Sequence, residues 1–274
     1  MKKTKRKDHY IPQGYLRGFI DPSREKHPRP LWRLEIPTNT WSARSPKEVG
    51  HRRRFYDYVG VGTMLETETA DSAFLRMEND YPLIRREMVS SGFARWTEHL
   101  EFLLGFMQMM RARSTLFREQ RVAEGKTLLH YEIEEVYPDR NAIKLKSMTP
   151  TPVSPAFIKN RAITEMREEI QKGAAWLKDF DWALRYSDSI TDPFVISEVP
   201  FIVEGPPGGV KYAVEHPDSL LMFPLCWQAC LFGSRKHFDV QTQKFGLDDM
   251  RTMRKKYRAG AEAFMLSPVR FDEF

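Results

Sequence analysis

An imidazole, a guanidinium and a carboxylate are the side chains of this sequence with the most informative chemistry, and they stand at His9, Arg111 and Glu198. A histidine titrates near neutral pH, so it can accept or donate a proton, and a carboxylate can act as an acid, a base or a metal ligand. The planar fork of an arginine matches phosphate or carboxylate groups. We expect the fold to bring the three together as a site for an anionic substrate, with His9 and Glu198 as its catalytic residues.

Arg111 ends an apolar stripe on the strongest helical pattern of the chain. One face of that pattern carries, at positions i, i+4, i+8 and i+11, Leu100, Leu104, Gln108 and Arg111. An inward guanidinium needs a partner because an isolated buried charge is costly, and Glu78 and Glu198 are the carboxylates that we consider. Three interpretations stay open: a structural ion pair, an anion-binding arginine in a cleft, and a solvated arginine at a helix end.

The residues beside His9 extend this candidate site. His9 precedes a short predicted helix, where a histidine can cap the helix or act as a general base. Gln13 can hydrogen-bond a substrate or a neighbouring main chain, whereas Tyr10 is expected to support the wall of the site. A structural His9 with a satisfied hydrogen bond is the alternative to the functional one.

Ser197 and Glu198 follow a strand-rich stretch and precede Pro200. Such a strand end is a common position for a functional side chain. Ser197 lacks the Gly-x-Ser-x-Gly surroundings of a hydrolase nucleophile, so it is assigned to substrate binding. Glu198 is either an acid/base or metal-ligating residue or a salt-bridging one. The sequence requires no cofactor and assigns no metal.

The composition is that of an ordinary globular protein with excess positive charge. The chain has 274 residues, 41% of them hydrophobic and 29% charged, a net charge of +6 and two cysteines. These values exclude a disordered chain and a disulfide framework. The longest apolar runs are too short for a membrane span and no signal peptide follows the basic start, so a cytoplasmic protein is expected. Five of residues 1–7 are Lys or Arg; this flexible arm contacts a polyanion or remains solvated.

The periodicities predict one α+β domain over residues 8–274, after the arm. Long buried helices in the middle are expected to pack with short, mainly antiparallel strands from both ends of the chain. Helical patterns cover residues 10–19, 63–89, 97–120, 156–180 and 248–265. Strand patterns cover residues 31–36, 41–43, 54–59, 182–186, 194–197, 201–204, 220–223 and 229–232, with one or two short strands within 127–148.

Several short motifs together resemble one protein family. They are His9-Tyr10-Ile11-Pro12-Gln13-x-Tyr15-Leu16-x-x-Phe19, Gln108-x-x-Arg111, Ile196-Ser197-Glu198-Val199-Pro200 and Pro224-Leu225. In this order they resemble the bacterial, viral and fungal proteins grouped as domain of unknown function 4238. Arg54-Phe55-Tyr56 and Glu78 also stand where that family carries similar residues. The family commonly has Asp-Asn where this chain has Glu198-Val199, which keeps a carboxylate and removes an amide.

The resemblance implies positions and no reaction, so the function is predicted from the residues. The first hypothesis is a cytoplasmic enzyme, with a hydrolase as its reaction class, acting on a phosphate-bearing substrate such as a nucleic acid or nucleotide. The substrate-binding residues are then Gln13, Gln108, Arg111, Ser197 and Arg54, supported by Glu78 and Tyr10. The alternative is a non-enzymatic nucleic-acid or protein-binding module, in which His9, Arg111 and Glu198 form a buried structural network. The oligomeric state stays open.

Overall fold

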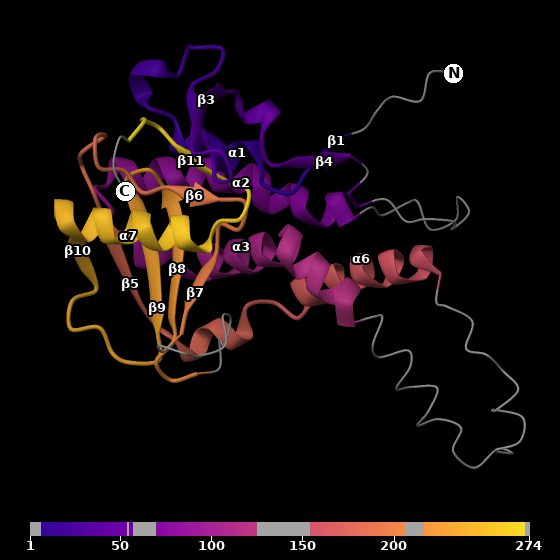
Figure 1. The fold of residues 1–274 in the computed structure, drawn as a ribbon. Coiled ribbons are helices and arrows are strands. Elements are labelled where there is room, and N and C mark those ends of the chain that lie inside the picture. The colour runs from indigo at the N-terminus through magenta and orange to yellow at the C-terminus, as the bar shows by residue number, and fades with distance from the viewer. Residues whose placement is uncertain (1–6, 54, 57–69, 125–153, 206–215, 272–274) are drawn as a thin grey trace, which may run out of the picture.

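The computed structural model describes residues 7–53, 55–56, 70–124, 154–205 and 216–271. These residues form a five-stranded, a four-stranded and a two-stranded β-sheet, with helices on both faces of the largest (Figure 1). Long helices from the middle of the chain pack with strands from both of its ends. The neighbouring strands are antiparallel with one exception, β10 beside β5. The predicted α+β class is confirmed.

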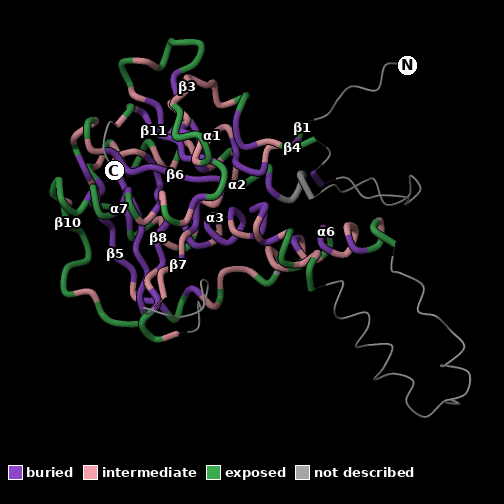
Figure 2. The backbone as a smooth tube through the Cα atoms, viewed as in Figure 1, coloured by how far each residue is buried: buried purple, intermediate pink, exposed green. Residues whose placement is uncertain are grey.

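The five-stranded sheet has the strand order β10-β5-β9-β8-β7. Its strands are β5 (Asp181–Tyr186), β7 (Ile202–Glu204), β8 (Leu220–Cys226), β9 (Ala229–Ser234) and β10 (Thr242–Lys244). Alternate side chains enter different cores: Leu221, Phe223 and Leu231 lie on one face, and Met222 and Phe232 on the other. Burial of both faces explains the apolar composition of β8 and β9. The edge strand β10 is exposed instead (Figure 2).

Helices α2 (Ala70–Ser90), α3 (Leu100–Arg113) and α6 (Pro155–Gln171) contribute to the core on the Phe223 face, and α7 (Leu247–Gly260) packs on the Met222 face. In α3 nearly every residue from Leu103 onward is buried. This is expected of a helix that is apolar almost all round. Figure 1 shows α7 on the side of the sheet opposite α3.

The four-stranded sheet has the order β3-β2-β11-β6, with strands β2 (Leu31–Glu35), β3 (Thr40–Arg44), β6 (Ile196–Ser197) and β11 (Phe264–Ser267). The prediction of helix over 248–265 was wrong in its last part. Helix α7 ends at Gly260, and β11 pairs with β2 on one side and with β6 on the other. Pairing on both edges buries all four residues of β11, and this tertiary contact overrides the local helical spacing.

Other predicted helices are shorter in the structure than their patterns. The pattern over 97–120 divides into a 3₁₀ turn at Trp96–His99, α3 and a helical segment over residues 115–124, with Ser114 extended at the break. The pattern over 156–180 breaks near Gly173, whose φ of +72° favours glycine. The N-terminal pattern contains α1 (Gln13–Leu16) and a 3₁₀ turn (Arg17–Phe19).

The N-terminal segment forms a strand before the helix that was predicted there. Strand β1 (Lys7–His9) pairs antiparallel with β4 (His51–Arg53), so Lys7 belongs to a strand and not to the arm. Residues 1–6 of the arm lie outside the described residues. So do Arg54, residues 57–59 of the predicted strand and the strands expected within 127–148; Phe55 and Tyr56 form a bend.

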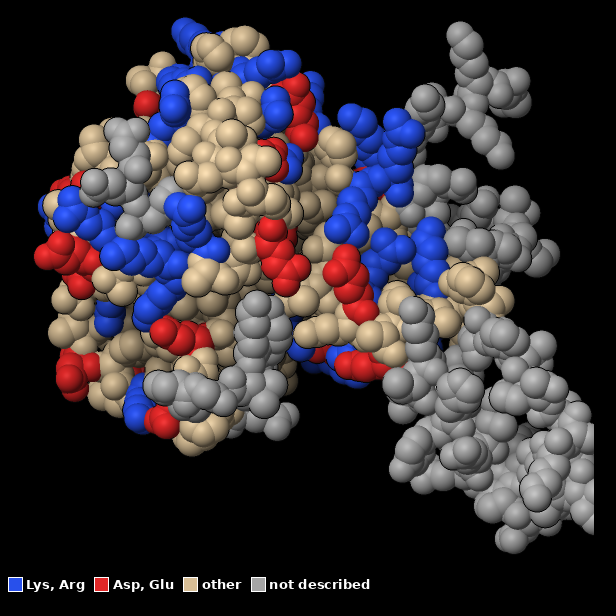
Figure 3. All heavy atoms as spheres, viewed as in Figure 1, with Lys and Arg blue, Asp and Glu red and all other residues tan. Residues whose placement is uncertain are grey.

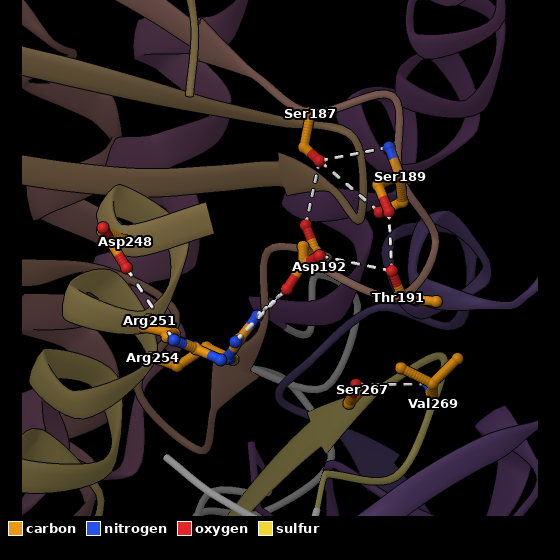
Figure 4. A network of polar contacts seen from close by, with 9 residues as sticks. All are labelled: Ser187, Ser189, Thr191, Asp192, Asp248, Arg251, Arg254, Ser267 and Val269. Atoms are coloured by element: carbon orange, nitrogen blue, oxygen red, sulfur yellow. Dashed lines mark hydrogen bonds and ion pairs between the residues drawn. The ribbon is translucent and has the colours of Figure 1, made fainter. Parts of the chain in front are cut away.

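A buried arginine ties α7 to the loop that follows β5 (Figure 4). Arg254 is 4% exposed, and its guanidinium lies 3.4 Å from Asp192 Oδ1 and over the ring of Phe271. The Ser187 hydroxyl donates to the main-chain oxygen of Asp192 at 2.9 Å. This network fixes the outer helix against the sheet, on the side away from the N-terminal motif.

Candidate functional site

A cavity of about 460 Å³ lies between β1, α1 and α2, and both His9 and Gln13 line it. We call it the His9 cavity. Its other polar lining residues are Lys7, Asp8, Arg17, Glu78, Asn79 and Arg113. Gly14 lets α1 approach α2 closely, since a Cβ there would lie 3.0 Å from Cγ of Pro82. The N-terminal motif therefore builds one wall of an open, polar cavity.

His9 presents a half-buried imidazole to this cavity. Its Nε2 lies 3.5 Å from Nε2 of Gln13, and its ring meets that of His51 edge-on at 5.4 Å between centroids. Burial, followed by His51, lowers the pKa of His9 below its ordinary value, against the opposing effect of the Lys47 carbonyl. His9 is therefore uncharged at neutral pH, and its Nε2 accepts a hydrogen bond from the Gln13 amide.

Arg113, at the end of α3, forms the back of the cavity and is only 1% exposed. Its guanidinium donates to a carboxylate oxygen of Glu78, to the main-chain oxygen of His9 and, at 2.7 Å, to the Tyr56 hydroxyl. Although burial acts in the opposite direction, Tyr56 and Glu78 raise the pKa of Arg113. This charged side chain therefore holds β1, α2 and α3 together.

Arg111 occupies a separate cluster between α3 and α6. Its Nη1 donates to Glu169 Oε1 at 2.8 Å, and its guanidinium lies between the rings of Phe117 and Trp176. Gln108 is 2% exposed and completes the cluster through the main-chain oxygen of Glu169 and the indole of Trp176. Neither Glu78 nor Glu198 is the partner of Arg111, so the predicted pairing was wrong.

Replacing Arg111 by alanine is expected to lower the free energy of unfolding by about 1.5–3 kcal/mol, the range for hydrogen bonds to charged groups. The loss stays modest because the side chains of Arg111 and Glu169 are 26% and 19% exposed, so solvent compensates part of it. Arg111→Lys should lose less. Urea unfolding measures both, and a loss above 5 kcal/mol for Arg111→Ala would contradict this half-exposed pair.

Ser197 and Glu198 direct their polar atoms to the main chain. Glu198, 7% exposed, accepts from the backbone N–H of Glu262, Ala263 and Phe264, the last two at 2.9 and 3.0 Å. The Ser197 hydroxyl donates to the Val199 carbonyl at 2.8 Å. These contacts position the start of β11 and use both carboxylate oxygens, which favours the structural interpretation of this motif.

The three residues expected to share a site thus have different partners. Within the described residues, no hydrogen bond or ion pair joins His9, Arg111 and Glu198 to one another. His9 and Gln13 do come together, and Glu78 joins them in the cavity lining. Tyr10, next to His9, is buried, which raises the pKa of its phenol to about 12. It therefore stays protonated and supports the core.

The first and last of the short motifs meet in space. The fully buried Tyr15 of α1 donates its phenol to the main-chain oxygen of Pro224, and Tyr81 of α2 donates to that of Leu225. A register shift in β8 between Pro224 and Cys226 interrupts the regular ladder at this point. The two phenols thereby supply donors to carbonyls at an irregular part of the sheet.

A search of protein families matches residues 7–251 of the chain to one family, described as a protein of unknown function (DUF4238). The chain belongs to DUF4238. The match covers the N-terminal motif, the pair on α3 and both later motifs, as the sequence analysis predicted. No curated protein and no solved structure matches the chain. DUF4238 membership therefore brings no assigned reaction, and the function must be argued from the site.

In this DUF4238 protein the family-like residues divide into two groups. Tyr15, Glu198 and Pro224 make buried contacts that hold elements together. His9 and Gln13 face a cavity. Arg54, which stands where the family carries a similar residue, lies outside the described residues.

Arg113 is the site residue that the sequence analysis missed. A signal for it exists, because a second stripe along the same helix carries, at i, i+3, i+7 and i+10, Leu103, Phe106, Met110 and Arg113. All four are at most 1% exposed. Following that stripe places Arg113, rather than Arg111, at its buried end.

Two further observations concern the described residues alone. They hold no group of three or more His, Cys, Asp or Glu side chains arranged to bind a metal ion. Among their helices, none combines the length and the hydropathy that crossing a membrane requires.

Both cysteines, Cys226 and Cys230, are free and buried, and burial raises the pKa of each thiol.

Proposed function

We propose that this protein binds a phosphate-bearing ligand, a nucleic acid or nucleotide, in the His9 cavity and acts as a binding module. The observation that supports this most is the pair His9 and Gln13, which faces an open cavity with an uncharged imidazole and an amide. An amide donates to phosphate oxygens, and Nε2 of His9, which accepts while the imidazole is neutral, donates once the ring is protonated. Both groups are therefore suited to a phosphate that enters this cavity.

The charges around the cavity favour an anion. Lys7 and Arg17 are exposed at its border, and within the described residues neither forms an ion pair with a carboxylate. Of the acidic lining residues, Glu78 pairs with the buried Arg113, and Asp8 is 3% exposed and accepts from the Tyr56 amide. Lysine and arginine gather on the same part of the surface, over β1 and β4 (Figure 3).

A hydrolase acting on the same ligand is the second candidate. His9 is half-buried in an open cavity and, because its pKa is lowered, uncharged at neutral pH, as a general base must be. The binding module is preferred because Glu198 and Arg111, the other residues expected in the reaction, are engaged by the main chain and by Glu169. His9 would then act as the base without either of them.

His9→Gln separates the two candidates, with a fluorescent thymidine dinucleotide as the probe. A binding module predicts that the wild-type protein binds the probe more tightly as the pH falls through the lowered pKa of His9, because the imidazolium then donates to phosphate. The variant should lose this pH dependence and bind about tenfold more weakly at low pH, which corresponds to one charge-assisted hydrogen bond. Fluorescence anisotropy between acidic and neutral pH measures both.

The matched control is His216→Gln, since His216 is partly exposed and outside the cavity lining. It should leave the pH dependence intact. Release of cleaved probe by the wild-type protein, abolished in His9→Gln and rising as the pH increases, would support the hydrolase. Absence of binding by the wild-type protein at every pH would contradict both candidates.

A further inference from the structure

A second and larger cavity, of about 1010 Å³, adjoins the His9 cavity. It runs along α1 and the second half of α2, and we call it the Arg85 groove. Gln13, Gly14, Arg17 and Pro82 line both cavities, so the two form one continuous depression. Gly18 gives the Arg85 side chain room to lie in the groove, because a Cβ there would come within 2.8 Å of its Nη1.

Four cations line this groove without carboxylate partners. They are Arg17, Lys47, Arg85 and Arg86, and the described residues offer an ion pair to none of them. Among the residues that the structure describes, the acceptors of Arg85 and Arg86 are the main-chain oxygens of Gly14 and Pro82. Most arginines elsewhere in the described chain do pair with acids, for example Arg95 with Glu98 and Arg161 with Glu165. Against these four cations the lining holds one carboxylate, Glu25, so the groove keeps an excess of positive charge that favours several negative charges in a row.

The size of the depression favours an extended ligand. Drug-sized ligands occupy cavities of about 300–1,000 Å³, and the Arg85 groove alone reaches the upper end of that range before the His9 cavity is added. A single nucleotide in the His9 cavity would leave the groove and its cations without an anion. A chain with a phosphate at each step would reach both.

Aromatic and amide groups in the groove favour bases between those phosphates. Trp227 and His27 line it, the first partly buried and held by its backbone N–H to the Gly18 oxygen at 2.9 Å, the second exposed. Bases of single strands stack on such rings, whereas the bases of a duplex are already stacked on one another. The amides of Gln13 and Gln228 offer hydrogen bonds to base edges or phosphates.

We infer that the Arg85 groove binds single-stranded nucleic acid, with the strand continuing into the His9 cavity. This inference rests on the proposed function and narrows its ligand from any phosphate-bearing molecule to an oligonucleotide. The four cations neutralise successive phosphates, and Trp227 and His27 stack bases. Because these contacts address the backbone and the faces of bases, binding has little sequence preference.

The test compares the thymidine dinucleotide with an oligothymidylate of about 12 nucleotides, a length within the range that single-strand sites cover. The wild-type protein should bind the longer strand more tightly. Lys47→Gln with Arg86→Gln, two exposed groove positions, should weaken binding of the longer strand about 10- to 30-fold near 0.1 M salt. The salt slope should fall by about 1.4, because each phosphate contact on a single strand contributes about 0.7. Binding of the dinucleotide should change little.

The matched control removes the same number of charges from α7, on the opposite face of the sheet, as Arg251→Gln with Lys255→Gln. It should leave the affinity for the long strand close to that of the wild-type protein. Equal losses of affinity for the long strand in the two double variants would overturn the groove assignment, as would equal affinity of the wild-type protein for the two lengths. Binding of the dinucleotide tests the proposed function separately. Equally tight binding of a duplex, of inorganic polyphosphate or of polyglutamate would overturn the assignment to single-stranded nucleic acid.

Discussion

Replacing Arg113 by methionine is expected to lower the free energy of unfolding by about 3–5 kcal/mol, the cost of breaking a buried charge pair. Methionine has a similar length and keeps the apolar contact with Phe74 and Tyr56. It leaves the Glu78 carboxylate and the main-chain oxygen of His9 without their donor. For a chain of this size the thermal midpoint should fall by about 6–20 °C.

Two comparison variants make this prediction specific. Arg111→Met removes the same group two residues earlier on the same helix, where the pair is partly exposed, and should cost less. Glu78→Gln combined with Arg113→Met should recover part of the loss, because the unpaired carboxylate is then gone. Thermal and urea unfolding of all three variants measure these differences. If Arg113→Met is as stable as Arg111→Met, Arg113 is not the residue that holds β1, α2 and α3 together.

Glu198→Ala is expected to cost about 3–6 kcal/mol of unfolding free energy. The change leaves the backbone N–H groups of Glu262, Ala263 and Phe264 without their acceptor. The Phe264 N–H is buried, and an unsatisfied buried donor costs about 1–3 kcal/mol. Glu262 and Ala263 are exposed, so water replaces part of the roughly 1.5–3 kcal/mol that each hydrogen bond to a charged group contributes. Glu198→Gln keeps one acceptor oxygen, so it should lose roughly half as much. Urea unfolding monitored by tryptophan fluorescence measures both variants.

The control for charge is Glu262→Gln, which removes an exposed carboxylate beside the same loop and should have almost no effect. A second readout separates a structural Glu198 from a catalytic or binding one. Glu198→Gln should bind the thymidine dinucleotide with wild-type affinity under conditions where it is folded. If Glu198→Gln has normal stability but does not bind the dinucleotide, Glu198 is a binding or catalytic residue and not a structural one.

The long helices and the central strands were predictable because their apolar periodicities are strong, as in α3 and β8, whereas the short strands β1, β10 and β11 were not predicted. The partner of each polar residue was not predictable, and Arg111 and Arg113 illustrate why. A helix buried on several faces has no single inward side, so the stripe that ends at Arg111 and the stripe that ends at Arg113 are both candidates for the buried face, and the prediction rested on the first. The tertiary packing distinguishes them: Arg113 pairs with Glu78 of α2 and is 1% exposed, whereas Arg111 pairs with Glu169 of α6 and is 26% exposed.

The role of Glu198 illustrates a second limit. The backbone N–H groups that donate to the Glu198 carboxylate belong to residues 262–264, more than 60 residues further along the chain. Every residue except proline has such an N–H group, so the sequence does not indicate which ones will be the donors. Long-range pairing with β2 and β6 likewise forms β11 where the end of a helix was predicted. The His9 and Gln13 pair could be found because both residues lie within one short motif, four residues apart, at the end of β1 and the start of α1.

The phenol of Tyr15 bonds an oxygen 209 residues further along the chain, and Arg113 reaches back 104 residues to His9. During translation the N-terminal wall of the cavity is synthesised first, and the residues that hold it in place, Arg113 and Pro224, are synthesised much later. Contacts of such long range form slowly. Tyr15 can pack early against Tyr81 of α2 and Phe106 of α3, but its contact with β8 has to wait until Pro224 has been synthesised. Nascent chains that stop before Pro224 should therefore expose apolar surface of the N-terminal segment that β8 covers in the folded protein. A chaperone that recognises short apolar segments would bind there.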